Sequence, residues 1–294
     1  MRKITLGRTG LEVPPIGLGG YPFSGVNRAR GWDPYSEEGR RTAIRTVNAA
    51  LDRGVTYIDT APAYGDGHSE TLIGEVMAAR RDECVLATKV GWRGMDGRAV
   101  TESVQASLRR LRTDHVDVIQ FHGGVYTDDD RRHILEGGPL EALRRLREQG
   151  QVRFIGLTTE EPHSCLGLLQ TDAFDVAQLA YNVIYQGAAL HALPEARRRD
   201  VGVVTMRSMT SGVLQRLLPV IAPEWEGARD SYQVCLRFLL ADSRVHVANI
   251  GMRWPEEVER NVALVESFQP EADLADLPRM TAAVYRALDE EAAG

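Results

Sequence analysis

Short runs of apolar, often β-branched residues alternate along the chain with segments in which apolar residues recur every three or four positions. The short runs predict strands, and the helical spacing predicts amphipathic helices between them. The predicted strands span residues 15–19, 56–59, 85–89, 116–121, 152–157, 176–179, 201–206 and 245–250. The helical stripes are Ile44/Val47/Leu51, Leu72/Ile73/Val76/Met77, Val100/Val104/Leu108/Leu111, Leu140/Leu143/Leu146 and Val258/Val262/Val265.

Several residues mark where these helices begin and end. Ser69 precedes the second stripe and is expected to be its N-cap, because a serine hydroxyl accepts a free backbone N–H there. Pro255 suits the first position of the last predicted helix. Gly54 and Gly150 end the first and fourth stripes, as glycine commonly does after a helix.

Strands that alternate with helices predict right-handed βαβ crossovers and a parallel sheet. Eight such units follow one another without a Pro/Gly/Ser-rich linker, so we expect one domain over residues 1–294 of the α/β class, a (β/α)8 TIM barrel. An open doubly wound sheet is the alternative. That fold usually carries Gly-x-Gly-x-x-Gly after its first strand, where this chain has only Gly17-Leu18-Gly19-Gly20.

The composition of the chain limits the classes of molecule that it is expected to bind. A net charge of −6 argues against nucleic acid, which requires a basic surface. No run of 18 apolar residues predicts a membrane span, and the first residues lack the apolar core of a signal peptide. Cys84, Cys165 and Cys235 lie far apart with no Cys-x-x-Cys, which favours a reducing compartment and no metal site. We therefore expect a cytoplasmic monomer or weak homo-oligomer that binds a small molecule.

Polar residues occur where several predicted strands end. Asp59 ends the second strand and Tyr64 follows it, Lys89 ends the third strand, and His122 follows the fourth. The carboxyl ends of the strands meet at one mouth of such a barrel, where its chemistry takes place. These four side chains are therefore candidate catalytic residues.

Lys89 is unusual because only two of the 35 basic residues are lysine; the rest are arginine. A buried ammonium requires a partner, and Asp59 suits this role. An ammonium beside a phenol lowers the pKa of the phenol below its reference of about 10, so Tyr64 is expected to titrate low and to protonate a carbonyl oxygen. A neighbouring His122 would orient that oxygen.

Four ordered segments resemble the aldo-keto reductase family, over nearly the whole chain. They are Asp59-Thr60-Ala61-x-x-Tyr64-Gly65-x-x-x-Ser69-Glu70, Val85-Leu86-Ala87-Thr88-Lys89, residues 113–122 and residues 150–156. The resemblance implies hydride transfer between NADP(H) and an aldehyde, ketone or sugar, or the reverse oxidation. It also implies that Tyr64 is the acid/base, Lys89 tunes it, Asp59 pairs with Lys89, and His122 orients the carbonyl.

The resemblance also implies cofactor-binding positions. They are Thr158, Thr159, Gln178, Met206, Arg207, Ser211, Gly212, Leu214, Gly251, Met252, Arg253 and Asn261. Thr158-Thr159 departs from the family's usual Ser-Asn. Arg253 suits a 2′-phosphate, but Glu257 stands where relatives that prefer NADP often carry Arg, so NAD(H) stays an alternative.

Other interpretations remain open. Asp59 and Lys89 could form a purely structural ion pair. The chain could be a Schiff-base aldolase with Lys89 as nucleophile, or a non-catalytic NADPH-binding subunit or redox sensor. Tyr21 and Trp92 lie in predicted loops at the barrel mouth and are expected to line a substrate pocket.

Overall fold

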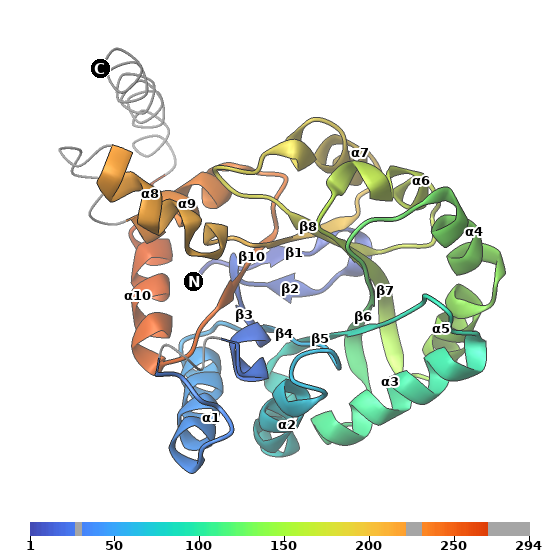
Figure 1. Ribbon diagram of the computed structural model, residues 1–294, viewed down its shortest axis with the longest axis horizontal. Helices are drawn as coiled ribbons and strands as arrows, with labels where there is room; N and C mark the ends of the chain where they lie inside the picture. The colour runs from blue at the N-terminus through green and yellow to red at the C-terminus, as the bar shows by residue number, and fades with distance from the viewer. Residues whose placement is uncertain (27–30, 222–230, 270–294) are drawn as a thin grey trace.

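The computed structural model describes residues 1–26, 31–221 and 231–269 of the chain (Figure 1). Within these ranges, parallel strands close into a barrel, which confirms the predicted (β/α)8 architecture and excludes the open sheet. The barrel strands are β3 (Ile16–Gly19), β4 (Tyr57–Asp59), β5 (Val85–Val90), β6 (Val116–His122), β7 (Val152–Thr159), β8 (Val176–Ala180), β9 (Gly202–Met206) and β10 (Val247–Gly251). Each strand pairs with its neighbour in sequence, and β10 pairs with β3 to close the ring.

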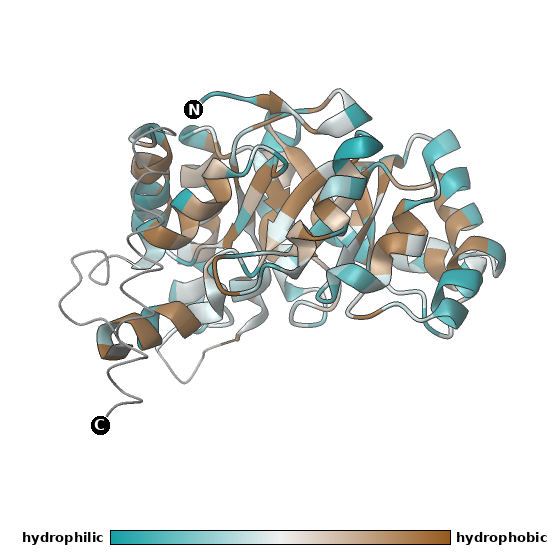
Figure 2. Ribbon diagram, turned by 90° about the horizontal axis from the view of Figure 1, so that it is seen from above, coloured by the Kyte–Doolittle hydropathy of each residue, from teal (hydrophilic) through white to brown (hydrophobic). Residues whose placement is uncertain are grey.

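Helices surround this barrel as an outer ring (Figure 1). They are α1 (Glu37–Asp52), α2 (His68–Arg80), α3 (Gly97–Leu111), α4 (Asp128–Glu136), α5 (Pro139–Glu148), α6 (Leu166–Leu169), α7 (Ala192–Arg198), α8 (Val213–Ile221), α9 (Ser231–Ala241) and α10 (Pro255–Glu266). Figure 2 shows hydrophobic strands at the centre and helices with hydrophilic outer faces. The predicted stripes therefore mark the helix faces that pack on the barrel, as in α3, where Val100, Val104, Leu108 and Leu111 are buried.

The prediction for the start of α2 is wrong, whereas Pro255 does open α10 as expected. Gly67 is the N-cap of α2, with φ of 82°, and Ser69 lies inside the helix. The Ser69 hydroxyl instead donates to the carbonyl of Gly20 at 2.9 Å and lies 2.9 Å from the Thr60 hydroxyl. The reason is a tertiary contact. The hydroxyl of Ser69 connects α2 to the ends of two barrel strands, and it is therefore not used to cap the helix.

The lower half of the barrel interior is apolar. Alternate strands β4, β6, β8 and β10 contribute side chains to one layer of such a barrel. Here they contribute Tyr57, Val118, Val176 and Val247, which pack in one buried cluster. The N-terminal hairpin of β1 (Ile4–Thr5) and β2 (Glu12–Val13) covers this end, with Leu6, Leu11 and Val13 in the same cluster.

Two residues further along these same four strands, the side chains become polar. They are Asp59, Gln120, Gln178 and Asn249. Small residues on the intervening strands leave room for them: a Cβ at Gly156 would lie 3.0 Å from Gln120, and one at Gly19 would lie 3.1 Å from Asn249. Because side chains two apart on a strand share a face, the barrel changes from apolar to polar within one step. This step lies at the carboxyl ends of the strands.

Candidate active site

Asp59 and Lys89 form a buried ion pair at the polar end of the barrel. Asp59 is opposite Ala87 in the β4–β5 register, so Lys89, two residues further, faces the interior as Ala87 does. The Lys89 ammonium donates to both carboxylate oxygens of Asp59, at 2.9 and 2.7 Å, and to the Thr60 carbonyl at 2.7 Å. Both side chains are 1% exposed. Although burial lowers the pKa of Lys89, its interactions with Asp59 and Tyr64 more than offset that effect, so the net pKa is raised and the ammonium stays charged.

Tyr64 lies above this pair, in the loop between β4 and α2. The Lys89 ammonium is 4.8 Å from the centre of the Tyr64 ring. The ring also meets Tyr21 edge-on, with centroids 5.2 Å apart, and His122 edge-on at 5.8 Å. The four residues predicted from the strand ends therefore lie together, as expected.

The expected low pKa of Tyr64 is not what the structure indicates. Burial raises the pKa of the Tyr64 hydroxyl above its ordinary value, and the attraction of the phenolate to Lys89 offsets only part of that rise. The reason is that a phenolate deep in the mouth loses its hydration, and Asp59 repels it as well. Tyr64 is therefore a neutral phenol near neutral pH, the form that donates a proton, while Lys89 lowers the cost of releasing it.

His122 ends β6 beside Tyr64. Burial, and then the positive charge of Lys89, lower the pKa of His122 to about 4. The imidazole is therefore neutral at physiological pH. A neutral imidazole can donate a hydrogen bond to a carbonyl oxygen without competing with Tyr64 as the proton source.

A cavity of about 730 Å³ opens over these four side chains. It extends from Tyr21 and His122 towards α10. Of the residues expected to bind cofactor or substrate, those that line it are Tyr21, Thr158, Gln178, Met206, Arg207, Ser211, Gly212, Gly251, Arg253 and Asn261. Its lining residues come from the ends of β7 to β10 as well as from β4 to β6, and a volume of about 730 Å³ suits a ligand larger than a simple aldehyde.

Three expected cofactor-binding residues lie elsewhere. Thr159 and Met252 each follow a lining residue, and alternation turns them to the other side. The hydroxyl of Thr159 donates to the carbonyls of Gly124 and Glu161, whereas Met252 is buried in the core. Leu214 packs in a small apolar cluster with Leu218, Val234 and Cys235. None of these side chains reaches the cavity.

Trp92 is a core residue, contrary to the expectation that it lines the substrate pocket. It is 3% exposed, stacks on Tyr126 with ring centroids 4.9 Å apart, and meets Phe121 edge-on. Its indole N–H points to Asp130 at 3.4 Å. Aromatic packing under α4 therefore occupies the side chain, although its loop does lie near the mouth.

The cavity wall offers hydrogen-bonding groups that have no partner among the described residues. The side-chain carbonyl oxygens of Gln178 and Asn261 are buried and have no hydrogen-bond partner among the described residues. Buried polar atoms normally find partners, so these two suit a polar ligand in the cavity. Arg253 and Arg260 supply positive charge there, next to Glu257, whose carboxylate accepts the backbone N–H of Arg253 at 2.5 Å.

The loop after β9 is strained where it borders the cavity. Arg207, Thr210, Ser211 and Gly212 have φ between 52° and 80°, in the left-handed region that favours glycine. The Arg207 guanidinium pairs with Glu160 at 2.6 Å and reaches the Ser211 hydroxyl at 3.2 Å. Such strain commonly occurs at ligand-binding loops. The donors and charges along this wall fit the phosphates and amide of the dinucleotide that the family resemblance implies.

Several residues of the cavity or the site are not among the site residues predicted from the sequence. Gln120 and Asn249 donate to Asp59, and Glu160, Tyr232 and Arg260 line the cavity. Gln120 and Asn249 interrupt apolar strands at positions that face the barrel interior, a period-two signal that the sequence did contain. Arg260 and Tyr232 carry no such signal, because exposed helix residues of these types are common.

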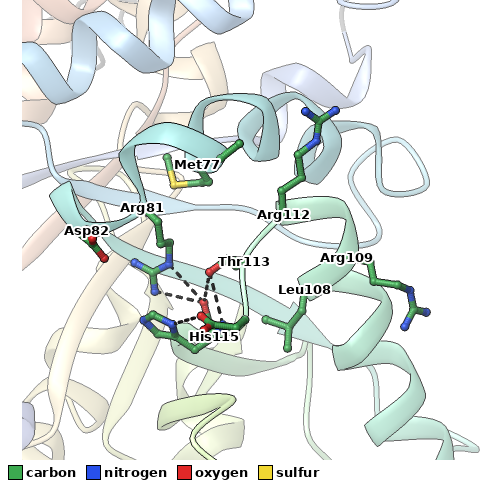
Figure 3. Close-up of a pocket in the computed structure, with 10 residues that line it drawn as sticks. Met77, Arg81, Asp82, Leu108, Arg109, Arg112, Thr113 and His115 are labelled. Atoms are coloured by element: carbon green, nitrogen blue, oxygen red, sulfur yellow. Dashed lines mark hydrogen bonds and ion pairs between the residues drawn. The ribbon is translucent and has the colours of Figure 1, made fainter.

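The rest of the described chain differs from the mouth of the barrel in its chemistry. No group of three or more side chains that could hold a metal ion occurs within the described ranges. None of the helices in the described part of the chain is long and apolar enough to cross a bilayer. A second hollow of about 690 Å³ lies between the C-terminal ends of α2 and α3 (Figure 3). Arg81 and His115 line it, and these helix ends lie at the base of the barrel, away from the four candidate catalytic residues.

Comparisons with known proteins agree with this geometry. The model of the aldo/keto reductase family matches residues 15–218. The chain is 27% identical to L-galactose dehydrogenase of Arabidopsis thaliana, over 90% of this chain and 88% of that protein. It is 28% identical to pyridoxal 4-dehydrogenase of Microbacterium luteolum, over 92% and 94%.

Solved structures share the fold. An aldo-keto reductase from Bacillus halodurans in its holo form is 25% identical, with a TM-score of 0.77 over 94% of this chain and 96% of that one. An aldo/keto reductase from Klebsiella pneumoniae, in complex with NADP and acetate, is 24% identical, with a TM-score of 0.78 over 95% of each chain.

Proposed function

Because the chain belongs to the aldo/keto reductase family, we propose that it transfers a hydride between NADP(H) and a carbonyl or alcohol substrate, with Tyr64 as the proton donor and acceptor. The observation that carries the proposal is the buried Asp59–Lys89 pair beneath Tyr64, with His122 beside the ring. The relatives named as dehydrogenases, and the neighbour in complex with NADP, support the class of reaction.

In this mechanism the bound nicotinamide supplies the hydride, and the residues supply position and a proton. The neutral His122 imidazole holds the substrate oxygen, and Tyr64 donates its hydroxyl proton to that oxygen. The phenolate left behind lies near the Lys89 ammonium, which Asp59 keeps charged and in place. In the reverse direction the phenolate accepts the proton of the alcohol.

The cavity wall fits the cofactor in three places. Gln178 would hold the carboxamide of the nicotinamide, since its side-chain oxygen is buried without a partner in the described residues. The strained loop at Ser211 and Gly212 would contact the pyrophosphate. Arg253, with Asn261 beside it, would hold the adenosine end. Arg260 adds a second positive charge there, which favours a 2′-phosphate and hence NADP(H) over NAD(H).

The Schiff-base aldolase is less consistent with the geometry. A nucleophilic lysine must lose its proton, whereas the neighbouring charges raise the pKa of Lys89 and its ammonium is bonded to Asp59 and Thr60. Borohydride added with a carbonyl substrate is expected to leave no adduct on Lys89. A trapped adduct at this residue would favour the aldolase.

Purified protein tests the proposal directly. NADPH and NADH binding are measured by the change in nicotinamide fluorescence, and turnover by absorbance across aldehydes, ketones and sugars. We expect tighter binding of NADPH and oxidation of NADPH that depends on a carbonyl substrate. Binding without turnover of any of these substrates would favour a non-catalytic subunit, and neither binding nor turnover would overturn the proposal.

A further inference from the structure

Two amide side chains converge on the Asp59 carboxylate in addition to Lys89. Gln120 donates its amide N–H to Oδ1 at 3.2 Å, and Asn249 donates to Oδ2 at 3.1 Å. Gln120 comes from β6 and Asn249 from β10, each two strands away from β4 on opposite sides. Asp59 therefore has one amide donor on each oxygen, and Lys89 bonded to both.

The orientation of both amides follows from the chemistry of the carboxylate. An ionised carboxylate only accepts hydrogen bonds, so each amide must present its NH₂ group to Asp59. The carbonyl oxygens of Gln120 and Asn249 then point elsewhere, and both are buried without a partner among the described residues. An unmade bond of this kind costs about 1–3 kcal/mol. Folding stability alone does not account for the two amides.

The surrounding barrel accommodates both amides closely. Gly156 on β7 lies against Gln120, and Gly19 on β3 lies against Asn249, at distances where a Cβ would press on the amide side chain. Directly below, Tyr57 packs with the valines of the apolar layer, and its hydroxyl makes no hydrogen bond to either amide among the described residues. The hydrogen-bond partner that the two amides share is the carboxylate.

We propose that Gln120 and Asn249 are positioning residues that fix the Asp59 carboxylate and, through it, hold the Lys89 ammonium beneath Tyr64. We call these two residues the amide pair. The inference deepens the proposed function and rests on it for the role of Tyr64. Neither amide carries a charge, so each acts on Tyr64 only by controlling where Asp59 and Lys89 lie.

The groups that face Tyr64 limit what else could change its titration. They are Lys89, Asp59, Tyr21 and His122, from β5, β4, the loop after β3, and β6. When one amide is lost, the carboxylate can rotate, and the ammonium bonded to both of its oxygens moves with it. Because Lys89 partly offsets the burial that raises the pKa of Tyr64, a displaced Lys89 lets that pKa rise further.

The first test uses Gln120→Leu and Asn249→Leu, which remove the donor and keep much of the volume. The pH profile of the single-turnover rate of alcohol oxidation reports the phenolate form of Tyr64. We expect the rising limb to move up by about one pH unit in each variant, with a loss of about tenfold on that limb. Gln120 does not line the cavity, so its variant should keep the wild-type affinity for NADPH.

Val247→Ala is the matched control. Val247 lies two residues before Asn249 on β10 and packs in the apolar layer, and its side chain has no group that could hydrogen-bond to Asp59. This variant is expected to lower the stability and leave the pH profile in place. If Val247→Ala moves the profile as Asn249→Leu does, general loosening of the barrel explains the shift and the inference is wrong.

The second test observes Lys89 without turnover. The sequence has two lysines, of which Lys3 is exposed, so protein labelled with ¹⁵N-lysine gives two side-chain signals that Lys3→Arg assigns. In the amide-pair variants we expect the Lys89 signal to move and its N–H protons to exchange faster, while the Lys3 signal stays unchanged. An unmoved Lys89 signal in the folded variants overturns the inference, even if the kinetics change.

The two tests separate the inference from the proposed function. One outcome is a wild-type protein that turns over substrate through Tyr64, with variants in which neither the pH profile nor the Lys89 signal moves. This outcome leaves the proposed function intact and overturns the positioning role of the amide pair. The other outcome is a protein without turnover whose Lys89 signal still moves in both variants. This outcome overturns the proposed function and supports the positioning role of the amide pair.

Discussion

Two buried aspartates at opposite ends of the barrel have different partners. Asp59 lies at the mouth and pairs with Lys89, and both side chains are 1% exposed. Asp117 lies on β6 near the base and pairs with Arg81 at 2.7 Å and Arg153 at 2.6 Å. Asp117 also accepts the backbone N–H of Leu86 at 2.9 Å.

The cations differ in what they do besides pairing. The Arg81 guanidinium uses its other N–H groups on the carbonyls of Cys84 and His115, so it connects two loops at the base. The Lys89 ammonium lies beneath an aromatic ring that borders a cavity. A planar fork suits the first task, and a compact charge suits the second. Under the proposed function, the group beside the cation separates the two pairs: an aromatic ring that borders a cavity at the mouth, and backbone carbonyls at the base.

Of the changes that test this difference between the mouth and the base, Tyr64→Phe at the mouth is expected to have the largest effect. The change removes the hydroxyl that exchanges the proton, so kcat for carbonyl reduction should fall by about 10²-fold or more. NADPH affinity and the free energy of unfolding should stay near the wild-type values. Steady-state kinetics and fluorescence titration measure both, and retention of most of the wild-type kcat would dismiss Tyr64 as the acid.

Asp117→Asn tests the base and should give the opposite pattern. It leaves Arg81 with a weaker partner, and breaking a buried pair costs about 3–5 kcal/mol; because Arg153 is half exposed, we expect about 2 kcal/mol. The kcat of the folded variant should be unchanged. Urea unfolding gives the stability, and a loss of kcat at full folding would show that the two ends are coupled.

The lowered pKa of His122, at the mouth of the barrel, predicts that the free energy of unfolding depends on pH. Its pKa is about 4 when folded, against about 6.5 when unfolded, so between these values the unfolded chain binds more protons. Stability is therefore full above pH 6.5 and is lost as the pH falls towards 4. Relative to His122→Phe, the wild type should lose on the order of 1–2 kcal/mol more over this window. Burial also lowers the pKa of His246 at the base, so only the difference between the two unfolding curves tests His122.

The smallest expected effect is that of Trp92→Phe. Because Trp92 stacks in the core and does not line the cavity, the KM for small aldehydes should stay within about twofold of the wild-type value. The cost should appear in the unfolding curve instead. A larger change in KM would support the expectation that Trp92 lines the substrate pocket.

Local pattern was enough to predict the barrel and the meeting of Asp59, Tyr64, Lys89 and His122, because strand ends in this fold converge by topology. It was not enough where tertiary contacts decide. The local sequence predicts Ser69 as an N-cap, whereas its hydroxyl donates to the carbonyl of Gly20, which lies 49 residues away in the chain.

The sequence was least informative about groups whose role depends on distant partners. The direction of the Tyr64 pKa depends on a balance between burial and Lys89 that no spacing reveals. Gln120 and Asn249 are 129 residues apart in the chain and meet only through Asp59. The resemblance implies that Thr159 and Leu214 bind the cofactor, whereas alternation and packing turn their side chains away from the cavity.

The most direct test of the account is the pH profile of kcat for carbonyl reduction by Lys89→Arg, with folding verified independently. A guanidinium keeps the positive charge but has more volume and a planar fork, and the barrel interior around Asp59 has little room for either. The account predicts that activity near neutral pH falls by more than about tenfold, a loss of roughly 1.4 kcal/mol or more. Retention of more than about a tenth of the wild-type activity would contradict the claim that the mouth requires an ammonium.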